Sequence, residues 1–269
     1  MPSAFSFDPI RLPPQCASLR REARQFLAGE IARGTFNPAN AKPDETEARQ
    51  FALRVGARGW IGMTWPRAFG GQERSYLERY VLAEEFFAAQ APVMHYFVAD
   101  RQCGPMLIQH ASERIKRELI PRIVRGELCF SIGMSEPGSG SDLFAAKAKA
   151  SRVDGGWVLN GTKSWVTNGH VSDYMVAVFR TSPPTRENRR HGLTSFLIDM
   201  QSAGIDCRRV TQMTGQRFNE VAFSDVFVPD DQLIGTIDGA ADQLAAGLSY
   251  ERSGPERFLE SYYVLPDLV

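Results

Sequence analysis

The hydrophobic pattern of the sequence changes its period near residue 127, and this change constrains the fold more than any other feature. Before Gly126, apolar residues recur every three or four positions, as they do in residues 17–33, which predicts helices. After Leu128, short apolar runs alternate with turn residues, which predicts strands. We therefore predict an α+β protein in three parts: an N-terminal all-helical domain (1–126), an antiparallel β-barrel-like middle domain (127–238) and the start of a C-terminal helical domain (239–269).

The helical half contains clear start and stop signals. Ser75 and Glu78 form a capping-box pair, in which each side chain can satisfy a free backbone donor, so a helix should begin there. Another helix should begin near Ser112, and Pro121 should end or kink it, because proline lacks the amide hydrogen that the helix needs. Residues 45–56 repeat the helical spacing.

The β half is divided by turns rich in glycine. Asp154-Gly155-Gly156 is a strong turn signal between two short runs, and residues 181–190 should form an exposed loop because they carry prolines and charges. Several short strands joined by such turns favour an antiparallel barrel or sandwich. The predicted strands are 128–134, 145–153, 157–159, 174–180, 194–199, 205–210 and 220–228.

Charge and cysteine usage narrow the class of partner. The chain has 31 Lys+Arg and 31 Asp+Glu, so no net field attracts nucleic acid or an anionic membrane. No apolar run approaches the roughly 18 residues of a membrane helix, and residues 1–14 do not resemble a signal peptide.

The 4 histidines show no metal-ligand spacing, so we predict no metal site. Scattered cysteines without a CxxC pair predict reduced thiols and a cytoplasmic protein: Cys16, Cys103, Cys129 and Cys207.

Residues 134–142, Met-Ser-Glu-Pro-Gly-Ser-Gly-Ser-Asp, form the first segment that can carry chemistry. Glycines let a ligand approach the backbone, Ser135 and Ser141 add hydroxyl groups, and successive amides can bind an anion. The segment is neither a Walker A loop nor a Rossmann fingerprint, since the Gly-Lys-Ser/Thr ending and the βαβ context are absent. An ordinary turn between strands is the alternative reading.

Residues 161–169 form a second segment of this kind. Trp165 offers a flat apolar face, and Thr167 adds a hydroxyl beside it, which suits a planar cofactor. A core tryptophan at the end of a strand is the alternative.

Together the two segments resemble the flavin-binding signature of the acyl-CoA dehydrogenase family. Five other segments look like family features: 83–85, 100–105, 119–121, 226–229 and 249–252. The resemblance implies an FAD-dependent enzyme that forms a 2,3-double bond in an acyl-CoA thioester. It also implies an electron-transferring flavoprotein as the electron acceptor and a homo- or hetero-oligomer as the assembly.

The resemblance also implies roles for single residues. Ser135 and Ser141 would bond the flavin ring edge and the pyrophosphate, and Ser141 would also lie along the acyl-CoA path. Trp165 would stack on the flavin, and Thr167 would reach its N5 and O4 edge. Substrate binding would fall to Ser141, Ser249 and Arg252, although family members usually have an acidic residue where Ser249 stands. The implied FAD-binding residues are Ile132, Met134, Ser135, Gly140, Ser141, Trp165, Val166 and Thr167.

The general base is the hardest role to place. Members of the family remove the α-proton with a carboxylate and transfer the β-hydrogen to the flavin as hydride. Most supply this glutamate late in a C-terminal bundle, but isovaleryl- and long-chain-type enzymes supply it directly before an arginine, which is the position of Glu251 here. Burial against flavin and acyl chain would raise the pKa of such a carboxylate toward neutrality. A solvated glutamate is the alternative, and Glu256 is a second candidate.

The last helical run raises a separate question, because a run that ends at Val269 would have an apolar face without a partner. We expect one of three explanations. The chain is a fragment of a longer protein, a short subunit completed by another polypeptide, or an inactive member of the family. The competing functions are therefore a non-catalytic or incomplete subunit of a heteromeric assembly, and an oxidase-like enzyme that uses O2.

Overall fold

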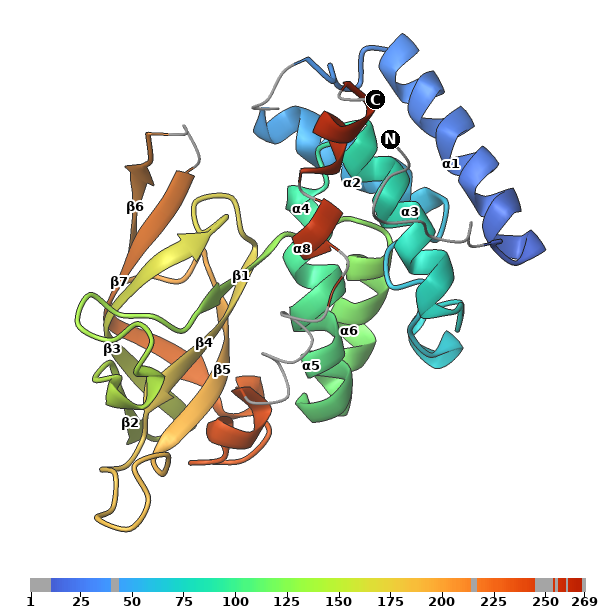
Figure 1. Cartoon of the computed structure of the whole chain (residues 1–269). Helices are drawn as coiled ribbons and strands as arrows, with labels where there is room; N and C mark the ends of the chain where they lie inside the picture. Colours follow the sequence, from blue (N-terminus) through green and yellow to red (C-terminus); the bar gives the residue numbers. More distant parts are fainter. Residues whose placement is uncertain are drawn as a thin grey trace, which may run out of the picture.

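The computed structural model describes residues 11–39, 44–213, 217–244, 254, 256–259 and 261–267. Helices form one layer and a twisted sheet forms the other, and the strand β1 enters the sheet directly from the helical layer (Figure 1). The helical layer contains α1 (Pro14–Ala32), α2 (Glu45–Ala57), η1 (Arg67–Phe69), α3 (Tyr76–Ala88), α4 (Met94–Val98), η2 (Ala99–Cys103), α5 (Gly104–His110) and α6 (Glu113–Val124).

The predicted helix starts are confirmed in the first half of the chain. Ser75 and Glu78 form the expected capping box at the start of α3, and the Ser112 side chain caps α6. Pro121 was expected to end or kink the second helix; it does not end it, because α6 continues to Val124 with Pro121 inside. Proline removes only one amide from the ladder, and the apolar face around it is buried in the core, which outweighs that loss.

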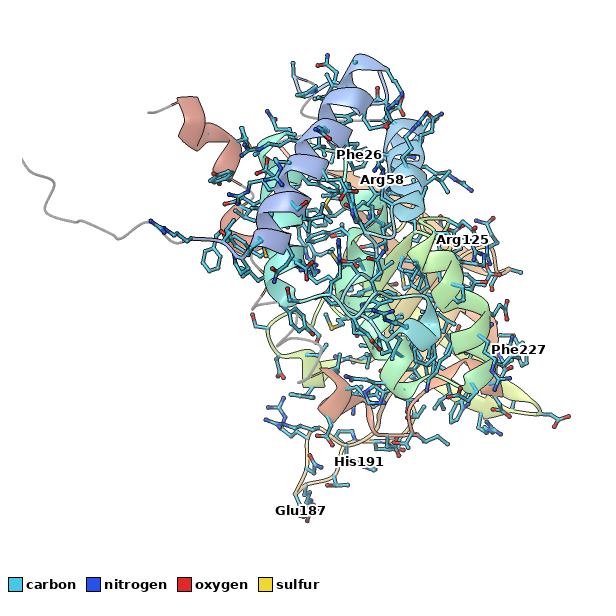
Figure 2. All side chains as sticks on the ribbon, turned by 90° about the vertical axis from the view of Figure 1, so that its right-hand side faces the viewer. Phe26, Arg58, Arg125, Glu187, His191 and Phe227 are labelled. Carbon is cyan, nitrogen blue, oxygen red and sulfur yellow. The ribbon has the colours of Figure 1, made fainter. Side chains whose placement is uncertain are left out.

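Aromatic side chains fill the helical core. Phe26 packs against Phe51 and Trp60 with ring centroids 5.9 and 5.1 Å apart, and Phe86 closes the same cluster. The Arg58 guanidinium lies 5.5 Å from the Phe26 ring centroid and covers this cluster at the surface (Figure 2). These contacts fill the centre of the helical layer.

The strands of the described residues form an eight-stranded sheet in the order β6-β7-β3-β2-β4-β5-β8, with β1 paired to β4. Most pairs are antiparallel, but β1–β4 and the single β2–β4 pairing are parallel. The turn Asp154-Gly155 joins β2 to β3 as expected, with Gly155 at φ 71°. The strands are β1 (Phe130–Gly133), β2 (Lys149–Val153), β3 (Gly156–Thr167), β4 (Tyr174–Arg180), β5 (Leu193–Asp199), β6 (Ile205–Thr211), β7 (Arg217–Pro229) and β8 (Leu233–Ile234).

One predicted strand is wrong in its first half. Residues 145–148 were expected to continue the strand at 149–153, but the short helix η3 (Leu143–Ala145) occupies the start of this segment. The amides of Lys147 and Ala148 donate to the Glu136 carboxylate at 2.7 and 3.0 Å, so they are not available to a strand ladder. Side-chain bonds therefore replace the sheet here.

The two layers share a continuous apolar core. Phe130, Val176, Leu197 and Ile234 come from the sheet and belong to the same buried cluster as the helices. The loop between β4 and β5 extends away from this junction, with Glu187 and His191 at one end of the molecule (Figure 2). None of the described helices is long and apolar enough to cross a membrane.

The last two described segments return to the helical layer, where α8 (Glu256–Leu259) and η5 (Tyr262–Asp267) pack on α3 (Figure 1). Before them, η4 (Asp230–Gln232) precedes β8, and residues 240–244 are helical and pack on the sheet through Ala240 and Leu244. All four cysteines are free thiols, and three of them are buried, as expected of reduced core residues.

Candidate functional site

Trp165 has an unusual backbone conformation near the end of β3. The β3–β7 register shifts between Lys163 and Val166, so Trp165 lies in a bulge with φ at 58°. Its side chain is 63% exposed and touches Phe218 edge to face, with ring centroids 5.8 Å apart. A bulky residue in the left-handed region is strained, and bulges re-aim side chains next to functional sites. The expectation of a core tryptophan does not apply: this indole faces outward.

The serine-glycine turn lies directly beside this bulge. The amide of Ser164, the residue directly before Trp165, donates a 2.8 Å hydrogen bond to the carbonyl of Ser135. The Ser164 hydroxyl is buried and has no hydrogen-bond partner among the described residues. The two segments that the sequence singled out therefore meet.

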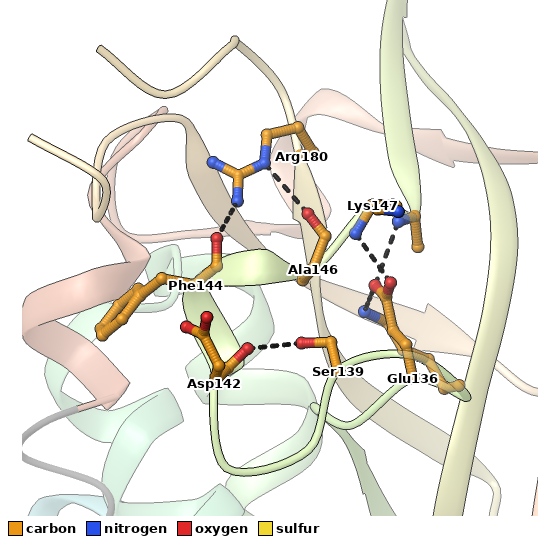
Figure 3. A network of polar contacts seen from close by, with 9 residues as sticks. Glu136, Ser139, Asp142, Phe144, Ala146, Lys147 and Arg180 are labelled. Carbon is orange, nitrogen blue, oxygen red and sulfur yellow. Dashed lines mark hydrogen bonds and ion pairs between the residues drawn. The ribbon is translucent and has the colours of Figure 1, made fainter. Parts of the chain in front are cut away.

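A buried ion pair fastens the start of the turn to β3. Lys163 is fully buried, and its Nζ lies 2.8 Å from Glu136 Oε1, while Glu136 also accepts two backbone amides (Figure 3). Burial lowers the pKa of Lys163 and opposes the effect of Glu136 on it. Burial would raise the pKa of Glu136, but Lys163 and the amides together hold it below its usual value. Sequence reasoning missed this pair, because its two members lie 27 positions apart and Lys163 has polar neighbours in the sequence.

A second anchor holds the far end of the turn. The Arg180 guanidinium donates to the carbonyls of Phe144 and Ala146 at 2.7 and 3.2 Å (Figure 3). It also donates to the His191 carbonyl at 2.7 Å. Arg189 pairs with Asp142 at 2.7 Å and ties the turn to the β4–β5 loop. Sequence reasoning did not identify either arginine, because their partners are backbone oxygens or lie far away in the chain.

The middle of the turn is open between these anchors. The Ser139 hydroxyl donates to the Asp142 carbonyl at 2.6 Å, which shapes the turn (Figure 3). A Cβ added to Gly138 or Gly140 would meet no atom within 4 Å, and Ser141 is exposed. A pocket of about 210 Å³ opens beside the turn, and its lining consists of Glu136, Pro137, Gly138, Ser139, Ala145, Lys147, Ala148, Gly161 and Thr162. The backbone here is accessible to a ligand.

The residues after Trp165 connect the site to the helical layer. Val166 is fully buried and Thr167 is half-buried. Asn168, at φ 63°, donates from its side chain to the Met94 carbonyl at 2.7 Å. The His170 Nε2 atom lies 3.0 Å from the Glu45 carboxylate at the start of α2. The helices therefore fix the position of the strand end.

The other predicted site residues are distributed as follows. Ile132 packs against the helical core, and Met134 packs against the buried cluster that contains Val178 and Leu193. Glu251, Ser249 and Arg252 lie outside the described residues. Glu256, the second candidate base, is buried in the helical layer, where it pairs with Arg79 at 2.7 Å.

Comparison with known protein families agrees with this geometry. The model of the acyl-CoA dehydrogenase N-terminal domain matches residues 13–127, and the model of the middle domain matches residues 131–226. The chain belongs to the acyl-CoA dehydrogenase family. Within this family the serine-glycine turn and the tryptophan bulge lie in the middle-domain match, and the aromatic cluster lies in the N-terminal match.

Individual acyl-CoA dehydrogenases resemble the chain over most of its length. Acyl-CoA dehydrogenase FadE26 of Mycobacterium tuberculosis is 29% identical over 248 residues, which are 90% of this chain and 62% of the relative. Mitochondrial isovaleryl-CoA dehydrogenase of Solanum tuberosum is 31% identical over 209 residues, which are 75% of this chain and 50% of the relative. The chain thus spans less than two thirds of these acyl-CoA dehydrogenases.

Solved structures of the family share the fold. The ChsE4-ChsE5 complex from Mycobacterium tuberculosis gives a TM-score of 0.81 at 29% identity and covers 90% of this chain and 61% of that chain. The Tcur3481-Tcur3483 steroid ACAD gives a TM-score of 0.84 at 26% identity and covers 96% of this chain and 66% of that chain. Both similarities extend across the helical and the sheet layers.

Acyl-CoA dehydrogenases use FAD, and the residues present fit this group. Trp165 offers an exposed aromatic face beside the Ser135 peptide. The open glycines at 138 and 140 allow close approach to the backbone, and the Ser164 hydroxyl lacks a partner among the described residues. An aromatic plane beside open backbone suits a planar ring that carries a phosphate chain.

Proposed function

We propose that the chain is the flavin-binding part of an FAD-dependent acyl-CoA dehydrogenase that forms a 2,3-double bond in an acyl-CoA thioester. The observation that supports this most is the exposed, left-handed Trp165 next to the hydrogen bond between Ser164 and Ser135. Strain of this kind persists only where surrounding structure maintains it, and it concentrates at ligand sites. The proposed division is a helical domain at 1–126, a β-domain at 127–238 and the start of a helical domain at 239–269.

In this proposal the β-domain binds the cofactor. Trp165 would stack on the isoalloxazine ring, Thr167 would bond its N5 and O4 edge, and Ser135 would bond the ring edge. Ser141 and the amide of Gly140 would receive the pyrophosphate, which suits the open backbone there. Ile132, Met134 and Val166 complete the apolar lining.

The chemistry divides between one carboxylate and the bound cofactor. FAD, when bound, supplies the acceptor at N5 for the β-hydrogen, which leaves as hydride. Glu251 takes the α-proton, so the α- and β-carbons each lose one hydrogen and a double bond forms between them. Arg252, Ser249 and Ser141 bind the CoA thioester and orient it.

Electron-transferring flavoprotein is the proposed oxidant of the reduced enzyme, and the proposed location is the cytoplasm. We further propose an oligomer, because relatives of this chain are complexes of two different polypeptides: ChsE4-ChsE5 and Tcur3481-Tcur3483. The same observation supports a second candidate, an incomplete subunit of a heteromeric acyl-CoA dehydrogenase whose partner completes the site.

A reconstitution experiment tests the proposal and separates the two candidates. The purified chain is titrated with FAD, and oxidised flavin absorbance is followed after anaerobic addition of isovaleryl-, octanoyl- or a steroid-side-chain acyl-CoA. Loss of oxidised absorbance together with an enoyl-CoA product lighter by two hydrogens is the expected result. Protein that stays colourless with FAD contradicts the first candidate, and recovery of colour with a co-expressed second polypeptide supports the other.

A further inference from the structure

The chain leaves the end of β3 through a tightly bound loop, residues 168–172. The Asn168 side chain donates to the Met94 carbonyl at 2.7 Å, and the Asn168 carbonyl accepts the Ser172 amide and hydroxyl at 3.0 and 2.7 Å. Gly169 packs so closely on β7 that an added Cβ would lie 3.0 Å from the Asn219 Cβ. The loop is therefore held by both β7 and the helical layer.

Asn219 is a buried amide at the centre of these contacts. Its side chain is fully buried, and its Oδ1 accepts both the backbone amide and the ring Nδ1 of His170, at 3.3 and 3.0 Å. An amide nitrogen at this place would face the backbone donor, so the hydrogen bonds identify the atom as oxygen and place a proton on Nδ1. The Asn219 Nδ2 is buried without a partner among the described residues. An amide that is buried and only half satisfied costs stability, which favours a positional role for it over a stabilising one.

The other ring nitrogen of His170 reaches the helical layer. Its Nε2 lies 3.0 Å from Glu45 Oε1 at the start of α2, and Arg209 of β6 lies 3.0 Å from the same oxygen. The His170 side chain is 12% exposed, so water competes little for these contacts. When both nitrogens carry protons, the ring donates to Asn219 and Glu45 together. The ring thus connects β7 to α2 across the junction of the two layers.

The sheet alone holds the end of β3 weakly. Beyond the bulge that contains Trp165, the described register pairs β3 with β7 at two positions, Val166 with Asn219 and Thr167 with Phe218. A bulge interrupts the ladder, and a bulky residue at a positive φ persists only where surrounding structure maintains it. The contacts of the following loop supply that support.

We propose that His170 is a positioning residue: held between Asn219 and Glu45, its ring fixes the end of β3 and thereby sets the directions of Trp165 and Thr167. The consequence for FAD rests on the proposed function, but the fixing of the strand end does not. A site of this kind needs side chains whose own orientation is locked by supporting hydrogen bonds.

Hydrogen exchange on the purified chain tests the fixing of the strand end. His170→Phe and Asn219→Leu should each speed exchange in residues 164–172 by roughly tenfold or more, because the loop loses its polar contacts and opens locally. His170→Gln keeps a side-chain donor and should be intermediate. Arg114→Met is the matched control, because Arg114 pairs with Asp231 at 2.6 Å in another contact between the two layers. Unchanged exchange in His170→Phe, or an equal rise in the control, overturns the proposal whether or not Asn219→Leu folds.

FAD titration followed by visible circular dichroism tests the consequence for the cofactor. His170→Phe should bind FAD about tenfold more weakly, and the circular dichroism of its bound flavin should differ from that of the wild type even at saturation, because the ring surroundings are displaced. His170→Gln should recover part of both, and Arg114→Met should match the wild type. Weaker binding with a wild-type spectrum at saturation contradicts positioning. A wild-type chain that binds no FAD contradicts the proposed function instead, and hydrogen exchange still decides the role of His170.

Discussion

Lys163 and Glu136 form an ion pair of 2.8 Å in the interior of the β-domain, with the lysine fully buried. The pair joins β3, which carries Trp165 near its end, to the turn that begins at Ser135. The arrangement of the candidate site therefore depends on an ion pair that joins its two segments in the interior of the β-domain.

Removing one member of this pair should destabilise the fold strongly. Lys163→Met leaves the Glu136 carboxylate buried with two amides and no cation, which should lower the free energy of unfolding by about 3–5 kcal/mol. Chemical denaturation measures this value. The double variant Lys163→Met, Glu136→Gln should lose less than the sum of the single variants, and an additive loss would show that the pair is not coupled.

The Glu136 carboxylate should make the free energy of unfolding depend on pH. The pKa of Glu136 is lower in the folded chain than its reference value of 4.5, so its ionised form stabilises the fold above that value. This contribution should decline as the pH falls from about 4.5 through the lower folded pKa. Denaturation of the wild type and Glu136→Gln at about pH 7 and pH 3 checks this, because the difference between them should shrink in acid. A difference that grows in acid contradicts the assignment.

Trp165→Gly should lower FAD affinity without lowering the free energy of unfolding. Glycine adopts a φ of 58° without strain, and the indole is 63% exposed, so the free energy of unfolding should rise by up to about 1 kcal/mol or stay unchanged. FAD affinity should fall by about tenfold or more, because the stacking face is lost. Phe227→Ala removes another aromatic that is 50% exposed on the same sheet and should leave FAD affinity unchanged. Equal affinity in wild type and Trp165→Gly would argue against the cofactor site.

Glu251→Gln should abolish most turnover while FAD binding is kept. A positioned base contributes roughly 100-fold or more to the rate, so loss of the carboxylate should lower flavin bleaching by at least that factor. Glu118→Gln is a matched change at a half-exposed glutamate of α6 and should keep the wild-type rate. Bleaching at the wild-type rate in Glu251→Gln would assign the base to another residue.

The thiols should react in an order set by burial. Burial raises the pKa of Cys129 to about 12 and raises that of Cys103 further, so neither should react with a disulfide reagent in the native protein. Cys207 is the partly exposed thiol and should react first. All 4 cysteines should react after unfolding, and fast native labelling of Cys129 would contradict the buried core.

Local signals predicted much of this architecture, because they depend on neighbouring residues. The Ser75–Glu78 capping box and the Asp154-Gly155 turn require only contacts within a few positions, and both are confirmed. The strand at 174–180 was predicted with its observed bounds, since its apolar run is buried on both faces.

The remaining features depend on residues far apart in the chain. Residues 145–148 do not form a strand because the Glu136 carboxylate accepts the amides of Lys147 and Ala148. The parallel pairing of β1 with β4 depends on where the chain leaves the helical layer at Phe130. The outward direction of Trp165 depends on a register shift between β3 and β7. Periodicity does not contain such information, because it describes one segment at a time.

The serine-glycine turn is fastened at both ends and open in its middle. At one end, Glu136 forms an ion pair with Lys163. After the other end, Arg180 donates hydrogen bonds to the carbonyls of Phe144 and Ala146. A ligand that arrives at residues 138–141 would therefore meet amides whose directions are already restricted, so little conformational entropy remains to be lost on association. Affinity at this place should consequently be sensitive to substitutions inside the sheet that never approach the ligand, since those substitutions would give the loop back its freedom.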